Sequence, residues 1–210
     1  MSRGTQTRKR QAPGARREAI LRAASEVFFE EGFKGASIDA VIARVGGSKR
    51  AIYSLFGSKE ALFAAIVTEN AHRALEGLGD KIAGGHDPRT MLEDFGMRLL
   101  EVLMSPMTLA LFRAVIGEGM RFPELAQAFY DNAPASAARR LGEVLDQYAK
   151  IGQIEVEDSF RAAEHFIGMV RGDLFLSVVL GLRSAPEPGE ARALVAEVTH
   201  IFLDGVTARG

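Results

Sequence analysis

Apolar residues recur at intervals of three and four along almost the whole chain, the spacing that places them on one face of an α-helix. The first such run begins near Arg16, and Gly32 ends it at a position typical of a left-handed cap. No segment alternates apolar and polar residues in the manner of a strand. The pattern therefore predicts an all-α protein of about nine helices.

Two short helices are predicted directly after this first run. Ser37 is a suitable N-cap for the first of them, whose apolar stripe ends at Gly46-Gly47. Ser48 is a suitable cap for the second, which ends at Gly57. Two short helices that are joined by a tight glycine turn and follow a longer helix match the helix-turn-helix pattern.

The rest of the chain predicts longer helices. One should run from Ser58 toward Gly77. Proline is favoured where a helix begins, because the first turn has no partner for the missing N–H. Three more starts are therefore expected, at Asp87-Pro88, Ser105-Pro106 and Phe122-Pro123. The third of these helices should bend at Pro134 and continue to Gly152, and two long helices should complete the chain, at about 158–182 and 188–208.

The composition, 47% hydrophobic and 25% charged, is that of an ordinary globular protein. The chain has no cysteine for a disulfide or a thiolate site, which fits a reducing compartment, and we expect a cytoplasmic location. The longest strongly apolar stretch, residues 174–182, is far shorter than the roughly 20 residues that span a bilayer. We therefore expect no membrane partner.

Charge is divided unevenly along the chain, although the formal net charge is only −1. Residues 1–59 hold 12 Lys or Arg against 5 Asp or Glu, a net of +7, whereas residues 60–210 hold 14 against 22, a net of −8. A basic head on an acidic body favours a polyanionic partner for the head alone. The alternative is a solvated basic arm without a partner, since residues 1–14 are polar and are predicted to be flexible.

The segment from 33 to 62 carries an ordered set of signals at fixed spacing. They are Phe33 after a helix-ending glycine, the cap Ser37, the turn at Gly46, and then Ser48-Lys49, Ile52-Tyr53, Phe56, Ser58-Lys59-Glu60 and Leu62. In this order they resemble the N-terminal head of the TetR family of transcription regulators. The resemblance implies a homodimer that represses transcription by binding a pseudo-palindromic operator in double-stranded DNA, and that a mainly apolar small molecule releases.

The same resemblance divides the chain into three parts: a basic arm at 1–14, a helix-turn-helix domain at 15–57, and a helical ligand-binding and dimerisation domain at 58–210. Three positions depart from the family pattern within the head. Gly47 stands where a small apolar side chain is usual, Ala51 where a hydroxyl or glycine is common, and Leu55 where a histidine often contacts phosphate. These departures leave the expected fold unchanged and weaken any inference about the operator sequence.

The candidate DNA-binding residues are Ser37, Ser48, Lys49, Arg50, Ala51, Tyr53 and Lys59. The first turn of the second short helix approaches bases and phosphates in helix-turn-helix complexes, and Arg50 there is suited to donate to guanine. A cation at Lys59 opposes the helix dipole at a cost of about 0.3–1 kcal/mol unless an anion is present. By resemblance, Lys59, Tyr53 and Ser37 contact phosphate. A charged, solvated helix face is the alternative.

The last two helices are candidates for the dimer interface, because the helix at 158–182 has apolar residues on two sides and needs two partners. One partner would be its own core. The other, by family analogy, is the same helix of a second subunit in a four-helix interface. The candidate interface comprises Ile167, Val170, Leu174, Val178, Leu194, Val195, Val198, Ile201 and Phe202. Burial wholly within one subunit is the alternative.

Large, soft apolar side chains are frequent in the middle helices, where they line a ligand pocket or form plain core. The candidate pocket residues are Phe95, Leu99, Phe112, Phe129, Phe166 and Met169, with His165 as an orienting polar group and Arg113, Arg171 or Asp173 beside it. These mainly apolar side chains predict a small apolar effector. The absence of any effector is the alternative.

Other functions find little support in the sequence. The four histidines are scattered without metal-ligand spacing, and Gly117-x-Gly119 lacks the third glycine and the preceding strand of a dinucleotide loop. We therefore expect no metal, no cofactor and no enzymatic activity. The alternatives are a helical small-molecule enzyme and a protein-binding adaptor with an incidental basic N-terminus.

Overall fold

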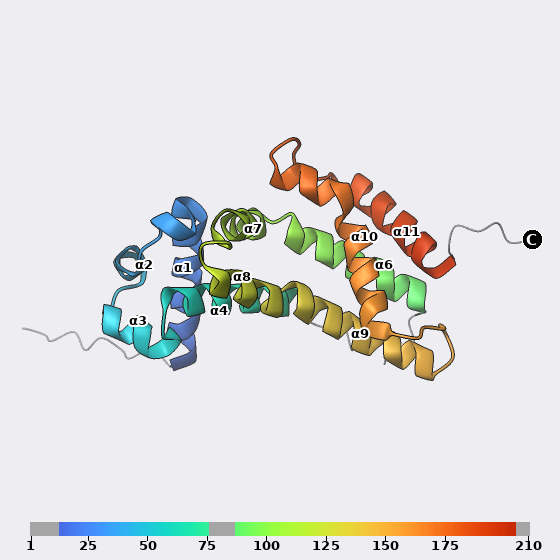
Figure 1. Cartoon of the computed structure of the whole chain (residues 1–210), viewed down its shortest axis with the longest axis horizontal. Helices are drawn as coiled ribbons and strands as arrows, with labels where there is room; N and C mark the ends of the chain where they lie inside the picture. The colour runs from blue at the N-terminus through green and yellow to red at the C-terminus, as the bar shows by residue number, and fades with distance from the viewer. Residues whose placement is uncertain (1–12, 76–86, 205–210) are drawn as a thin grey trace, which may run out of the picture.

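The computed structural model describes residues 13–75 and 87–204, and every regular element in those ranges is a helix. Ten helices lie there, or nine if α8 and α9 are counted as the one bent helix that the sequence predicts. They form an elongated molecule with α1, α2 and α3 at one end and α11 toward the other (Figure 1). The all-α prediction is confirmed.

No single helix in the described ranges is long and apolar enough to cross a membrane, and two bent helix pairs reach that threshold only together.

The N-terminal head is built from α1 (Pro13–Gly35), α2 (Ile38–Val45) and α3 (Lys49–Phe56). α1 begins earlier than the sequence suggested, because Pro13 and Gly14, which were assigned to the flexible arm, belong to its first turn. Gly32 interrupts α1 with a φ of 68°, at the position predicted for the end of the first run. Residues 1–12, the remainder of the predicted arm, lie outside the described ranges.

α4 (Lys59–Leu75) runs from the head into the body and is buried in a core that both share. This shared core contains apolar side chains of α1, α3 and α4 together with others from α7 and α8, among them Ile20, Phe28, Phe33, Ile52, Leu62, Phe63, Ile66, Val67, Leu111, Leu125 and Phe129. The packing is therefore continuous across residue 57, where the sequence suggested a domain boundary. That boundary stays a prediction about function, and the predicted end of α4 near Gly77 lies outside the described ranges.

Four helices follow, and each begins with a proline: α6 (Pro88–Leu103), α7 (Pro106–Glu118), α8 (Pro123–Asn132) and α9 (Pro134–Lys150). The first three starts were predicted, whereas at Pro134 the sequence predicted a bend within one helix. Asp87 caps α6 by accepting from the backbone N–H groups of Arg89 at 3.0 Å and Thr90 at 3.1 Å. A hydrogen bond from the Thr90 hydroxyl, together with these two, holds the pKa of Asp87 below its usual range. Ala133 leaves helical geometry and separates α8 from α9 at the predicted bend.

α10 (Ser159–Val179) and α11 (Pro188–Asp204) complete the described chain. Together with α6 and α9 they form a second core around large apolar side chains, among them Met91, Leu92, Phe95, Leu141, Leu145, Tyr148, Phe166, Val170 and Val195. The part of the predicted last helix beyond Asp204 lies outside the described ranges.

A break at Gly172 divides α10, and the sequence did not suggest it. Gly172 has a φ of 39° and a ψ of −158°, a combination that almost no residue except glycine adopts. Arg113 of α7 secures the end of the second segment, where the last carbonyls of a helix have no partner within it. Its Nε donates to the Val179 carbonyl at 2.7 Å and its Nη2 to the Val178 carbonyl at 2.9 Å.

Gly172→Ala should destabilise the protein by about 1–3 kcal/mol, because alanine is strained at this backbone conformation even though no neighbouring atom would touch the added methyl group. The measurement is the free energy of unfolding in urea. The matched control is Gly117→Ala in α7, which also faces open space and has an ordinary φ, and which should leave stability unchanged or raise it by up to about 1 kcal/mol. If both substitutions change the free energy of unfolding by the same amount, a side chain at position 172 does not strain the backbone.

Candidate DNA-binding surface and ligand cavity

α3 exposes the residues that the sequence assigned to DNA. Ser48 caps the helix, since its Oγ accepts from the Ala51 N–H at 3.2 Å. Ile52 is buried against the shared core, and this fixes which face of the helix points inward. Lys49, Arg50 and Tyr53 are consequently exposed, and Ser37 caps α2 in the same way, accepting from Ala40 N–H at 3.1 Å. Their contact with DNA stays a prediction.

The turn between α2 and α3 uses two glycines with positive φ, 72° at Gly46 and 107° at Gly47. Arg16 of α1 reaches this turn, and its Nη2 donates to the Gly46 carbonyl at 3.2 Å. A Cβ atom at Gly47 would lie 2.2 Å from that same nitrogen. Sequence analysis missed Arg16. The signal that pointed to it was the departure at Gly47, because the missing side chain leaves the space that the guanidinium occupies.

Several cations of the head are paired with its own carboxylates. Lys49 Nζ lies 2.9 Å from Asp39 Oδ2, and this hydrogen bond raises the pKa of Lys49. Arg44 pairs with Glu30 and, at 3.5 Å, with Glu26, which ties α2 to α1. Arg50, by contrast, makes no hydrogen bond or ion pair with any residue in the described ranges, and it is exposed. Of the cations at the start of α3, Arg50 is therefore the one that is free to meet a polyanion.

Lys59 does not point freely toward solvent. Its Nζ lies over the Phe33 ring, 4.6 Å from the ring centroid, and partial burial lowers its pKa against the opposing effect of Glu60, Glu118 and Glu31. The aromatic face attracts the ammonium group and offsets the unfavourable position at the start of a helix. The expected need for a phosphate at this site is therefore reduced, and a phosphate contact by Lys59 stays a prediction.

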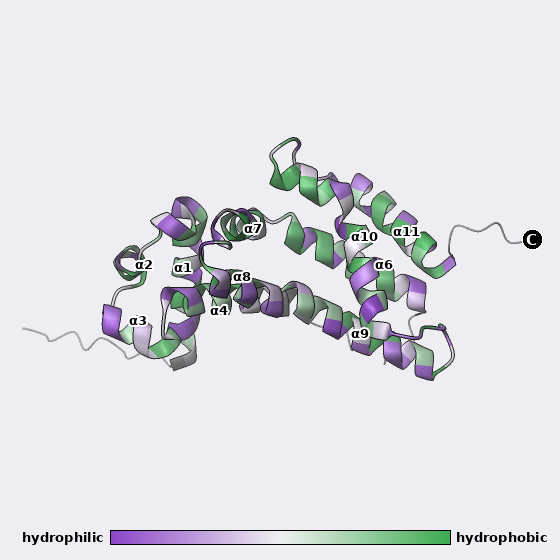
Figure 2. Cartoon of the chain, viewed as in Figure 1, coloured by the Kyte–Doolittle hydropathy of each residue, from purple (hydrophilic) through white to green (hydrophobic). Residues whose placement is uncertain are grey.

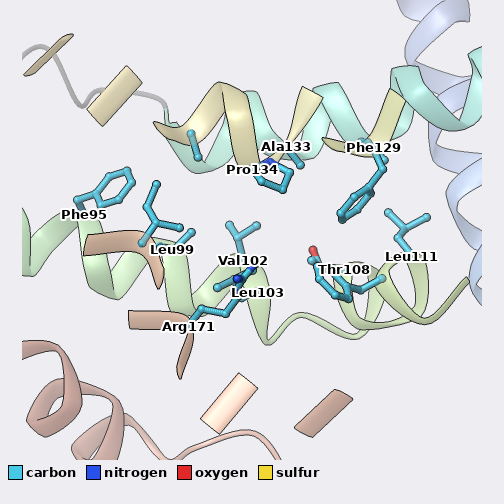
Figure 3. A pocket seen from close by; sticks show the side chains of 14 residues that line it. Phe95, Leu99, Val102, Leu103, Thr108, Leu111, Phe129, Ala133, Pro134 and Arg171 are labelled. Atoms are coloured by element: carbon cyan, nitrogen blue, oxygen red, sulfur yellow. The ribbon is translucent and has the colours of Figure 1, made fainter. Parts of the chain in front are cut away.

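An apolar cavity of about 90 Å³ lies in the body where α4, α6, α7, α8, α9 and α10 meet (Figure 3). Four predicted pocket residues line it, namely Phe95, Leu99, Phe112 and Phe129. Val67 of α4 and Thr108 of α7 also line the cavity and were not predicted. α10 contributes Ile167 and Arg171, four residues apart and therefore on one side of the helix.

Three predicted pocket residues lie elsewhere. His165 is exposed to solvent. Phe166 is completely buried in the second core, where its ring packs against Phe95 at 6.2 Å and Phe202 at 5.2 Å between centroids. Met169 packs against the same core. These assignments are corrected, because the side of α10 that carries Phe166 faces the second core and the side that carries Ile167 and Arg171 faces the cavity.

Part of the predicted dimer interface is also corrected. Val170, Val178, Val195 and Val198 are between 0% and 5% exposed in the single chain, so they have no surface left for a second subunit. Ile167 lines the cavity, and the remaining candidates, Leu174, Leu194, Ile201 and Phe202, are partly buried. The reason is packing within the chain, because Val170, Val195 and Val198 belong to the second core and Val178 packs with Leu109, Phe175 and Val179. The exposed apolar residues at the end of α10 are instead Leu176 and Leu180, followed by Leu182.

Family models match both ends of this architecture. The model described as bacterial regulatory proteins of the tetR family matches residues 20–66, which span most of α1 through the first half of α4. The model described as the C-terminal domain of AefR-like transcriptional repressors matches residues 90–205, more than half of the chain. The chain belongs to the TetR family. The relatives of this TetR-family chain are transcriptional regulators.

Individual relatives agree with this membership. The HTH-type transcriptional regulator UidR of Escherichia coli (strain K12) is 36% identical over 118 residues, which are 52% of this chain and 55% of UidR. The chain thus spans about half the length of this curated relative. A match to YdgC of Bacillus subtilis (strain 168), an HTH-type transcriptional regulator, is 25% identical over 215 residues, 100% of this chain and 97% of YdgC.

Solved structures of the family share the fold. A TetR-family regulator from Mesorhizobium loti superposes with a TM-score of 0.78 at 23% identity, covering 90% of this chain and 95% of that one. The flavonoid-responsive regulator FrrA superposes with a TM-score of 0.68 at 31% identity, again covering 90% of this chain and 95% of its own.

Asp39→Asn should tighten the binding of this TetR-family chain to DNA of any sequence. The substitution removes a carboxylate beside the exposed face of α3 and releases Lys49 to pair with phosphate. The slope of log K against log salt concentration should steepen by about one, as fluorescence anisotropy at several salt concentrations would measure. Glu157→Gln, the same charge change at an exposed residue just before α10, is the control and should alter neither quantity. An unchanged slope for Asp39→Asn would mean that Lys49 does not contact phosphate.

Proposed function

We propose that this chain is a homodimeric repressor, which binds a pseudo-palindromic operator through α3 and leaves the DNA when a mainly apolar small molecule occupies the cavity. The observation that carries the proposal is that one helix, α4, takes part in both sites. Its N-terminal half is packed against α1 and α3, and its Val67 is a wall of the cavity. Relatives that are repressors, and one that is flavonoid-responsive, support the two halves of the proposal.

DNA recognition follows from the exposed side of α3. A recognition helix places its N-terminal residues against base edges in the major groove, and Arg50 is unpaired there while Tyr53 follows one turn later. Ser37, Ser48, Lys49, Ala51 and Lys59 complete the proposed contact set. In this proposal the DNA-contacting part ends near Gly57, although its core extends into α4. Two copies would place their α3 helices in successive major grooves, about 34–36 Å apart.

Release by a ligand follows from the size of the cavity. Its volume of about 90 Å³ is well below the roughly 300–1,000 Å³ that small-molecule sites usually have, so an occupant must displace the walls. Two of those walls, α4 and α7, pack directly against α1 in the shared core. A displacement of either wall changes the position of the head. The coupling is reciprocal, because a ligand that weakens DNA binding must itself bind more weakly to the DNA-bound protein by the same factor.

The dimer is proposed to form through the exposed end of α10 together with α11. Leu176, Leu180 and Leu182 are 53%, 63% and 76% exposed, and the last turns of α10 are strongly apolar in Figure 2. Such contiguous apolar surface usually marks a contact with another molecule. Leu174, Leu194, Ile201 and Phe202 keep partial exposure in the single chain and stay candidates for the interface. No observation specifically favours the helical enzyme or the adaptor.

Selection of bound DNA from a random pool should recover a pseudo-palindrome, because two copies of α3 related by a twofold axis contact equivalent half-sites. A second selection with Arg50→Ala should relax one base position in each half-site, at a cost of about 1–3 kcal/mol for the original sequence. Ser54→Ala, at an exposed position of the same helix, is the control. Recovery of no consensus would overturn the proposed operator binding, and an unselective loss for Arg50→Ala would reassign Arg50 to phosphate.

Replacing both Leu176 and Leu180 by Glu should give monomers, because two buried carboxylates without partners oppose association. Analytical ultracentrifugation at micromolar concentration is the measurement. The control replaces Ile116 and Met120, which are 63% and 101% exposed in and just after α7, by Glu, and it should remain dimeric. A wild-type monomer would contradict the dimer altogether, whereas a dimeric double variant would place the interface elsewhere.

A further inference from the structure

We propose that the cavity takes an apolar molecule with a single carboxylate, and that Arg171 binds the carboxylate. The inference rests on the proposed function in that the cavity is treated as the effector site. It goes further by naming the chemical class of the effector and the residue that selects it.

Arg171 enters an otherwise apolar site. Figure 3 shows its side chain rising from α10 with the guanidinium group directed into the cavity, near Val102 and Leu103 of α6. No residue in the described ranges makes a hydrogen bond or an ion pair with this guanidinium. Arg113 of α7, by comparison, donates to two backbone carbonyls. Arg171 as a whole is exposed, so it stands at the edge of the apolar site. An unpaired guanidinium at this edge is suited to an anion that arrives with a ligand.

No acidic side chain lines the cavity or the groove beside it among the described residues. The other polar side chain in the cavity is Thr108, whose Oγ1 accepts a hydrogen bond from the Ser105 hydroxyl at 2.9 Å. Its own hydroxyl hydrogen is therefore available as a second donor, and Figure 3 shows its oxygen directed into the same space. One guanidinium and one hydroxyl match a singly charged carboxylate. A phosphate carries more charge and more acceptor oxygens than these two groups can satisfy.

A surface groove adjoins the cavity at Arg171. The groove, about 480 Å³ in volume, lies between α7 and α8 and shares Phe112, Phe129, Pro134 and Arg171 with the cavity as common walls. The Phe112 and Phe129 rings meet edge to face, with centroids 5.3 Å apart, and separate the two spaces. Arg171 therefore stands where a molecule entering from the groove would pass. The carboxylate of that molecule would stay bound to Arg171 at the entrance of the cavity. Its apolar portion would push the Phe112 and Phe129 rings apart.

The test is calorimetric titration of the full-length protein with three acids, hexanoate, decanoate and phenylpropionate, each paired with its neutral primary amide. At least one acid should bind roughly ten- to a hundredfold more tightly than its amide, because a hydrogen-bonded ion pair replaces a neutral contact of the same shape. Arg171→Gln should remove this preference and leave the amide affinity unchanged. Arg171→Lys should retain part of it, since the charge remains and the forked geometry is lost. Arg161→Gln, an exposed arginine of α10 outside the cavity, is the matched control.

Binding of no acid, equal binding of acid and amide, or a preference that survives Arg171→Gln would each overturn the proposal. Operator binding by the ligand-free protein is measured in parallel by fluorescence anisotropy, so that the two proposals fail separately. A protein that binds its operator and shows no acid preference retains the proposed function and loses the carboxylate site. A protein whose acid preference depends on Arg171 but whose DNA affinity is unaffected by the acid retains the site and loses the proposed release.

Discussion

The rings of Phe28 and Phe33 from α1 and of Phe63 from α4 pack against one another, with centroids 5.4 to 5.7 Å apart. Each such pair contributes about 0.5–1.5 kcal/mol beyond the burial of its area. Phe33 also meets Phe122 of the body, at 5.9 Å. This aromatic cluster joins α1 to α4 and the head to the body, so α1 cannot tilt without a response from α4. The orientation of α3, and with it the DNA-facing surface, depends on this contact.

The cavity lies against the same connection. Val67 is one turn beyond Phe63 on α4, so the wall of the cavity that α4 forms lies directly next to the aromatic cluster. Close-packed interiors respond to an inserted group by shifting whole elements, because few side chains can yield alone. In the proposed function, a ligand moves α4 because the empty cavity is too small to hold the ligand without displacing its walls. A larger, preformed pocket would admit a ligand without moving α4.

Local features of the structure were well predicted from sequence. Ser37 and Ser48 cap α2 and α3 through the hydrogen bonds expected of them, and the prolines at 88, 106 and 123 each begin a helix. These predictions succeeded because a cap or a proline acts on the backbone within one turn, whatever packs around it. The side-chain assignments on α10 were less successful. Phe166 and Ile167 are adjacent in sequence, and one is in the core while the other lines the cavity.

The sequence by itself determined the helices, their order, the basic head and the family, because helical periodicity, caps and a motif of thirty residues are all local properties of the chain. Only the tertiary structure decided which side of each helix meets which neighbour. The conformation of Gly172, the reach of Arg16 to the glycine turn and the direction of Arg171 into the cavity all depend on residues far away in the chain. An apolar stripe shows that a side is buried, but it does not say against what, since a core, a cavity and a second subunit exclude water equally well.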